Sequence, residues 1–189
     1  MRSVGFFYAF PQLMTQSWLP IIERLARRLY GSPIVRNSAR GELVEEIVAT
    51  ALEPEWQLTG DWGECDLKHP SGLRIQVKQS AARQSWHSPG AQPSRGHFST
   101  AYKTGRYESD GSWTSGRSRN ADIFIFAWHP LCDEDTDHRD PLQWRFFVIG
   151  ERALPEQASL SLATLRRHAE EIGYGELRSV VEMMTKAIA

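Results

Sequence analysis

Three polar side chains of different chemistry lie close together in the stretch from residue 62 to 80: Asp66, Gln76 and Lys78. A carboxylate and an amide oxygen can both ligate a hard divalent cation, and an amine can orient or deprotonate a water molecule. Together these groups are typical of a metal-assisted hydrolytic site. Such a site forms only if the fold brings the three side chains to one place.

A β-hairpin is the element expected to do this. Apolar residues at 73, 75 and 77 alternate with Arg74, Gln76 and Lys78, and residues 70–72 (Pro-Ser-Gly) supply a turn. Alternation places Gln76 and Lys78 on the same face of their strand, about 7 Å apart. The preceding strand returns alongside and carries Asp66 into the same neighbourhood.

A helix from residue 37 or 38 to about residue 52 is expected to add a carboxylate. Its buried face is predicted to comprise Val44, Ile47, Val48, Ala51 and Leu52. Glu45 lies one turn before Val48 and two turns before Leu52, so it tips toward the core, whereas Glu42 and Glu46 align with each other away from it. The alternative is that all three glutamates are solvated.

An acidic residue on one strand, followed by Glu or Gln, any residue and Lys on the next, is the signature of the PD-(D/E)xK nuclease superfamily. Residues 37–150 resemble this superfamily through Asp66 and the string Gln76-Val77-Lys78. The resemblance implies an α/β, restriction-endonuclease-like fold with an αβββαβ core, in which helices flank a mixed central sheet. The helix expected between the third and fourth strands is not recognisable in residues 81–118.

The resemblance also implies an activity, that of a Mg²⁺-dependent endonuclease that hydrolyses phosphodiester bonds, with DNA as the expected substrate and Mn²⁺ as a substitute metal. Glu45, Asp66, Gln76 and Lys78 would be the catalytic residues. The metal ligands would be Asp66, Gln76, the Val77 carbonyl and Glu45.

One departure from the pattern matters for the activity. Gln76 replaces the more usual acid, so the site has one fewer negative charge. The same substitution is found in active branches of the superfamily and in branches that have lost activity. The alternative hypothesis is therefore a non-catalytic nucleic-acid-binding or protein-interaction domain that retains the fold.

Residues 81–118 are rich in arginine, serine, glycine and aromatic side chains. Basic groups bind phosphate and rings stack on exposed bases, so this segment is a candidate nucleic-acid surface. The residues expected to contact nucleic acid are Arg83, Gln84, Trp86, Arg117 and Arg119. The alternative is an excursion of β-strands whose aromatic side chains pack onto the core.

The rest of the chain is expected to support this core. Residues 1–36 form a helical extension, with a helix capped by Ser17 and ended by Gly31. Residues 121–128 are nearly all apolar, which is typical of a central strand covered on both faces, and residues 144–149 form a further strand. Residues 151–189 are expected to supply helices that pack on the core.

Length and composition set the remaining bounds. The chain has 189 residues, a net charge of −1 and two cysteines. This fits a single domain with reduced thiols. No signal peptide or membrane span is recognised, so we expect a cytoplasmic protein. Cleavage of both strands of a duplex normally needs two sites, which would fit a homodimer.

Three other kinds of site are disfavoured by the sequence. Residues 129–138 contain two histidines, a cysteine and several acids, but their spacing matches no compact zinc pattern. There is no G-x-S-x-G string for a nucleophilic serine, and no G-x-x-x-x-G-K-[ST] phosphate loop.

Overall fold

The centre of the fold is a five-stranded mixed sheet, seen in a computed structural model that describes residues 18–60, 64–88, 90–107 and 112–188. In spatial order the strands are β1 (Gln57–Leu58), β2 (Leu67–Lys68), β3 (Arg74–Ala81), β7 (Ile123–His129) and β8 (Arg145–Gly150). β3 and β7 are parallel, and the other neighbouring pairs are antiparallel.

β7 lies between β3 and β8, and all its residues are buried, as its apolar sequence predicts. Its isoleucines at 123 and 125 contribute to one hydrophobic core, and its phenylalanines at 124 and 126 contribute to a second core on the opposite face. On neighbouring β3, Ile75 and Val77 face the first core. Gln76 and Lys78 therefore lie on the face of the second core, opposite Phe124 and Phe126 in register.

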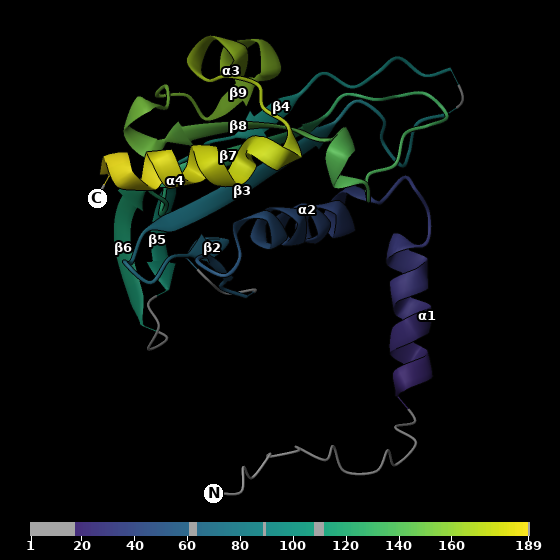
Figure 1. The fold of residues 1–189 in the computed structure, drawn as a ribbon, viewed down its shortest axis with the longest axis horizontal. Helices are drawn as coiled ribbons and strands as arrows, with labels where there is room; N and C mark the ends of the chain where they lie inside the picture. Colours follow the sequence, from purple (N-terminus) through teal and green to yellow (C-terminus); the bar gives the residue numbers. More distant parts are fainter. Residues whose placement is uncertain (1–17, 61–63, 89, 108–111, 189) are drawn as a thin grey trace, which may run out of the picture.

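Two helices cover the first face of the sheet: α2 (Asn37–Leu52) and α4 (Leu177–Ile188). Figure 1 shows α4 crossing in front of the strands, with α2 beside it. α2 buries Val44, Ile47, Val48 and Leu52 as its periodicity predicts, and leaves Glu42 and Glu46 exposed. α4 contributes Leu177 and Val181 to the same core, so the C-terminal helix packs on the core.

The second face is covered by a small sheet and a short helix. β4 (His97–Ser99) pairs with β9 (Ser159–Ser161), and α3 (Leu162–His168) follows directly. Phe98, Leu160 and Leu165 from these elements join the phenylalanines of β7 in the second core. Short 3₁₀ helices occupy Pro141–Gln143, Glu151–Ala153 and Tyr174–Glu176.

The connection from β3 to β7 differs from the expected αβββαβ order. It contains β4 and an antiparallel ribbon of β5 (Lys103–Tyr107) and β6 (Trp113–Ser118), and no α-helix in its described residues. The segment is therefore an excursion of β-strands, but of its aromatic side chains Phe98 is buried in the core whereas Trp86 and Trp113 are exposed, so this observation does not exclude a nucleic-acid surface. Serine, threonine and glycine at most positions of the two ribbon strands disfavour a helix. What the structure establishes is an α/β fold with a mixed sheet flanked by helices.

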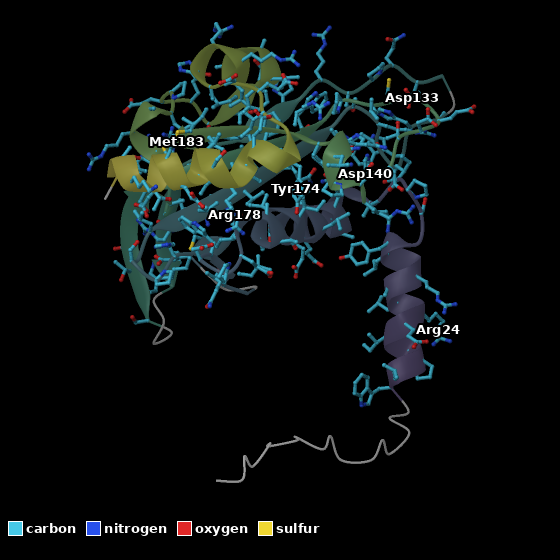
Figure 2. All side chains as sticks on the ribbon, viewed as in Figure 1. Arg24, Asp133, Asp140, Tyr174, Arg178 and Met183 are labelled. Carbon is cyan, nitrogen blue, oxygen red and sulfur yellow. The ribbon has the colours of Figure 1, made fainter. Side chains whose placement is uncertain are left out.

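α1 (Leu19–Tyr30) forms the expected helix of the N-terminal extension, although the proposed cap, Ser17, lies outside the described residues. Figure 1 shows α1 projecting away from the sheet, and Figure 2 shows Arg24 on it. Its apolar side chains at Ile21, Ile22 and Leu25 are exposed. Within the described ranges, no helix is long and apolar enough to cross a membrane.

Candidate active site

Asp66 is positioned by the hairpin that the sequence predicts. Its main-chain N–H donates to the carbonyl of Ile75 over 2.9 Å, and Thr59 donates to the Asp66 carbonyl over 3.1 Å. Gly72, with φ of 93°, forms the turn that lets the two strands pair. The Asp66 side chain is thereby aimed at β3, where its Oδ2 accepts hydrogen bonds from the Val77 main chain, over 2.6 Å, and from the Gln76 amide.

Gln76 is buried, and the two ends of its side-chain amide differ in their hydrogen bonding. Its Nε2 donates to Asp66, while its Oε1 is buried and has no hydrogen-bond partner among the described residues. A buried carbonyl oxygen without a partner costs free energy, on the order of 1–3 kcal/mol. An unsatisfied oxygen beside a carboxylate is an arrangement that a bound cation or water molecule would satisfy.

Lys78 is half-buried and electrostatically coupled to Asp66. Burial lowers the pKa of the Lys78 amine, and the Asp66 carboxylate opposes that shift. Burial likewise raises the pKa of Asp66, against the charge of Lys78 and the hydrogen bonds from Val77 and Gln76. Desolvation therefore outweighs mutual attraction for both groups, which makes each neutral form more accessible than in water.

Glu45 meets Lys78 at a pocket of about 280 Å³ on the edge of β3. The residues that line it are Gly41, Glu45, Val77, Lys78, Gln79, His97, Phe98 and Ser99. Glu45 is half-buried and raises the pKa of Lys78 through its charge, in opposition to burial. The prediction that Glu45, and not Glu42 or Glu46, tips toward the core is confirmed by their burial.

The predicted catalytic residues thus form two connected pairs. Asp66 and Gln76 are hydrogen-bonded to each other, Glu45 and Lys78 share the pocket, and the charge of Lys78 links the pairs. Asp66 and Gln76 are not among the residues that line the pocket. Lys103 of β5 adds a second positive charge that acts on both Asp66 and Lys78.

The donor set fits a hard divalent cation in its chemistry. Asp66 offers a carboxylate, Gln76 a buried amide oxygen without a partner, and Glu45 a second carboxylate. With two carboxylates the site is not acid-rich, and no cluster of three or more His, Cys, Asp or Glu side chains suited to a metal was found in the described part of the chain.

The residues expected to contact nucleic acid separate into buried and exposed groups. Gln84 and Arg119 are buried, so the expectation that they contact nucleic acid is wrong. Gln84 bonds to Arg40 and to the Ala81 carbonyl, and Arg119 bonds to carbonyl groups and pairs with Glu151. Both lie in or next to the stretch of basic and aromatic residues that predicts a nucleic-acid surface, and that local composition carries no information about their burial.

Three of the expected contact residues do reach the surface. Trp86 is 65% exposed, and Arg117 is exposed with its guanidinium group 4.4 Å from the centre of the Tyr102 ring. Arg83 is half-buried, and its guanidinium group donates to the Asp133 carbonyl. Trp86 and Arg117 are thus the exposed members of the expected set, and Lys103 of β5, on the same ribbon as Arg117, adds a further exposed positive charge.

Arg40 is a buried polar residue that the sequence interpretation missed. It is 1% exposed, and it donates to Gln79 over 2.8 Å, to Asn37 over 2.8 Å and to Gln84 over 3.0 Å. It lies one turn before Val44, so extending the buried stripe of α2 by one turn would have found it. Arg40 joins α2 to the end of β3, which carries Lys78.

His129 and His138 do come together, but in a structural cluster. Both are fully buried, with ring centres 4.9 Å apart, and pack around Trp144. The His138 Nδ1 accepts from the Val35 main chain over 3.1 Å, which places the proton of the neutral ring on Nε2. A ring held in this form presents no lone pair at Nε2 to a metal, which further disfavours zinc here.

No family model matches the chain, and no curated protein matches it at a significant level. The site therefore has to be interpreted from its own chemistry.

Proposed function

We propose that the protein is a metal-dependent nuclease that hydrolyses phosphodiester bonds in DNA, with Glu45, Asp66, Gln76 and Lys78 as its active site. The proposal includes a restriction-endonuclease-like relationship for the residue 37–150 core, in which β-strands replace the expected connecting helix. The observation that carries it is the bonding of the Asp66 carboxylate to Gln76 and Val77, on the strand that also presents Lys78.

Lys78 would act on the attacking water. Because burial lowers its pKa, a larger fraction of the amine is neutral than for an exposed lysine, and a neutral amine can accept a proton from water. Once protonated, the same group would stabilise the negative charge that develops on the phosphoryl oxygens. Glu45, in the same pocket, would hold the water in place by accepting a hydrogen bond.

Asp66, Gln76, the Val77 carbonyl and Glu45 are the groups that would hold Mg²⁺, with Mn²⁺ as a substitute. When bound, the ion would supply the positive charge that the phosphoryl group requires. Asp66 is already oriented for this role by its hydrogen bonds to β3, so little conformational freedom remains to be lost on binding.

Positive charge near the site supports a polyanionic substrate. Lys103 is exposed, lies close enough to act on the charges of Asp66 and Lys78, and belongs to the β5–β6 ribbon that also carries Arg117. Because the net charge of the chain is −1, binding would depend on this local concentration of cations. A homodimer would place two such sites on one duplex.

The proposal is tested with supercoiled plasmid and single-stranded DNA, each incubated with Mg²⁺, Mn²⁺ or chelator. Metal-dependent cleavage that is lost in Asp66→Ala and Lys78→Ala variants would support it. Metal-independent DNA binding without cleavage by any form would instead favour a non-catalytic binding domain, for which the replacement of an acid by Gln76 is the relevant observation.

A further inference from the structure

One residue that lines the pocket, His97, has no role in the proposed site. β3 and α2 contribute Lys78 and Glu45, and the facing strand β4 contributes His97 and Ser99. Alternation along β4 buries Phe98, which is 2% exposed, and leaves His97 and Ser99 exposed. His97 therefore lines the same pocket as Lys78, the residue that would activate water.

The main chain of β4 is held firmly in this position. His97 pairs with Ser161 of β9, and hydrogen bonds of 2.9 Å at each end join Leu162 to Gly96 and Thr100 to Ala158. Gly96 packs so closely that a Cβ there would lie 3.2 Å from the Trp128 ring. Because neighbouring Phe98 is anchored in the second core, the main chain of His97 is held beside the pocket.

Hydrolysis of a phosphodiester has a requirement that Lys78 alone does not meet. One proton must leave the attacking water, and another must reach the departing alkoxide, which is a poor leaving group when unprotonated. A lysine that accepts the proton of the attacking water lies on the nucleophile's side of the phosphorus atom. Histidine is the most frequent side chain in general acid catalysis, and His97 is the one imidazole among the described residues that line the pocket.

We propose that His97 is a catalytic residue, the general acid that protonates the leaving oxygen of the phosphodiester. This inference rests on the proposed nuclease function and adds a residue to its site. The water oxygen forms a bond to phosphorus, and the bond from phosphorus to the leaving oxygen breaks, with the electron pair passing to that oxygen. The His97 imidazolium gives it a proton, Lys78 receives the proton lost by the water, and solvent restores both groups.

The test compares two substrates that differ in one atom. The first is an oligonucleotide duplex with a natural phosphodiester at the cleaved position. The second has sulfur in place of the leaving oxygen, and a thiolate departs without a proton. Wild type, His97→Ala and His97→Gln are assayed on both, because glutamine retains hydrogen bonding without an acidic proton. His168→Ala, an exposed histidine at the end of α3, is the matched control.

The expected result is a loss of about 100-fold or more on the oxygen substrate for both His97 variants, with a loss of about threefold or less on the sulfur substrate. Equal losses on the two substrates, or no loss on either, would overturn the role of His97 while leaving the nuclease intact. Absence of cleavage of both substrates by wild type would overturn the proposed function itself. Circular dichroism and melting curves identify any variant that fails to fold.

Discussion

The main-chain N–H of Val77 donates a hydrogen bond of 2.6 Å to the Oδ2 of Asp66. This bond ties the carboxylate of Asp66, the residue immediately before β2, to β3, which presents Gln76 and Lys78, so the acid and the amine are positioned by the same stretch of main chain. Gln76 and Lys78 lie on a regular strand, and polar groups so placed are held more accurately than groups on loops. The hydrogen bond from Val77 therefore makes Asp66, Gln76 and Lys78 a local structural unit.

Replacing Asp66 by asparagine is expected to raise stability near neutral pH while removing activity. Burial raises the pKa of Asp66, so folding disfavours its ionised form; this penalty is fully present at pH 7.5 and fades as pH falls toward the ordinary aspartate range. We expect Asp66→Asn to melt about 2–4 °C above wild type at pH 7.5, on the order of 1 kcal/mol, and to approach wild type near pH 4. Scanning calorimetry at both pH values checks this, and a lower melting temperature at pH 7.5 would contradict it.

Lys78→Met is expected to separate binding from catalysis. Methionine has a similar length but no amine, so cleavage should fall by about 100-fold or more while affinity for DNA, measured in chelator, changes by less than about threefold. Because burial lowers the pKa of Lys78, its charged form is disfavoured in the folded state, and the variant should melt no lower than wild type at pH 7. Retention of cleavage would remove Lys78 from the site.

Arg40→Ala is expected to destabilise the protein by about 3 kcal/mol or more in urea unfolding. The guanidinium group is buried, which lowers its pKa to about 10, and its loss would leave acceptor oxygens of Asn37, Gln79 and Gln84 without their donor. Arg166→Ala is the control, because Arg166 pairs with Glu171 on the surface and such pairs contribute little. Similar effects of the two substitutions would contradict a structural role for Arg40.

Stability is expected to decrease between pH 7 and pH 5 because of the buried histidines. Burial and the nearby Arg40 charge lower the pKa of His138 to about 4, whereas the unfolded chain takes up this proton near pH 6.5. The stabilisation is present above pH 6.5 and is lost as pH falls toward 4, which amounts to about 2 kcal/mol at pH 5. Urea unfolding of wild type and His138→Gln measures it, and an equal pH dependence in the variant would contradict the assignment.

Much of the fold could be predicted because its elements have strong local patterns. β7 is apolar throughout since both its faces are covered, α2 repeats its apolar residues at helical spacing, and the Gly72 turn marks the hairpin. The region between β3 and β7 could not be predicted in the same way. Its short strands are defined by pairing with distant segments, such as β4 with β9, and no local pattern encodes that partner.

The candidate site was predictable to the extent that strand alternation determines it. Gln76 and Lys78 share a face because of the two-residue period of a strand, and Glu45 follows from helical spacing. His97 was not singled out because its relation to Lys78 arises only when β4 packs against β3. Gln84 and Arg119 were misplaced because their burial depends on bonds to Arg40 and Glu151, which are remote in sequence.

The central claim is tested most directly by the rate of plasmid nicking by wild type, Asp66→Asn and Lys78→Met in Mg²⁺ and in chelator, using preparations whose melting curves show that all three are folded. We expect nicking by wild type in Mg²⁺ only, with rates reduced by about 100-fold or more in both variants. Nicking that persists in chelator, or that is equal in the three proteins, would show that the Asp66 and Lys78 site does not perform the hydrolysis.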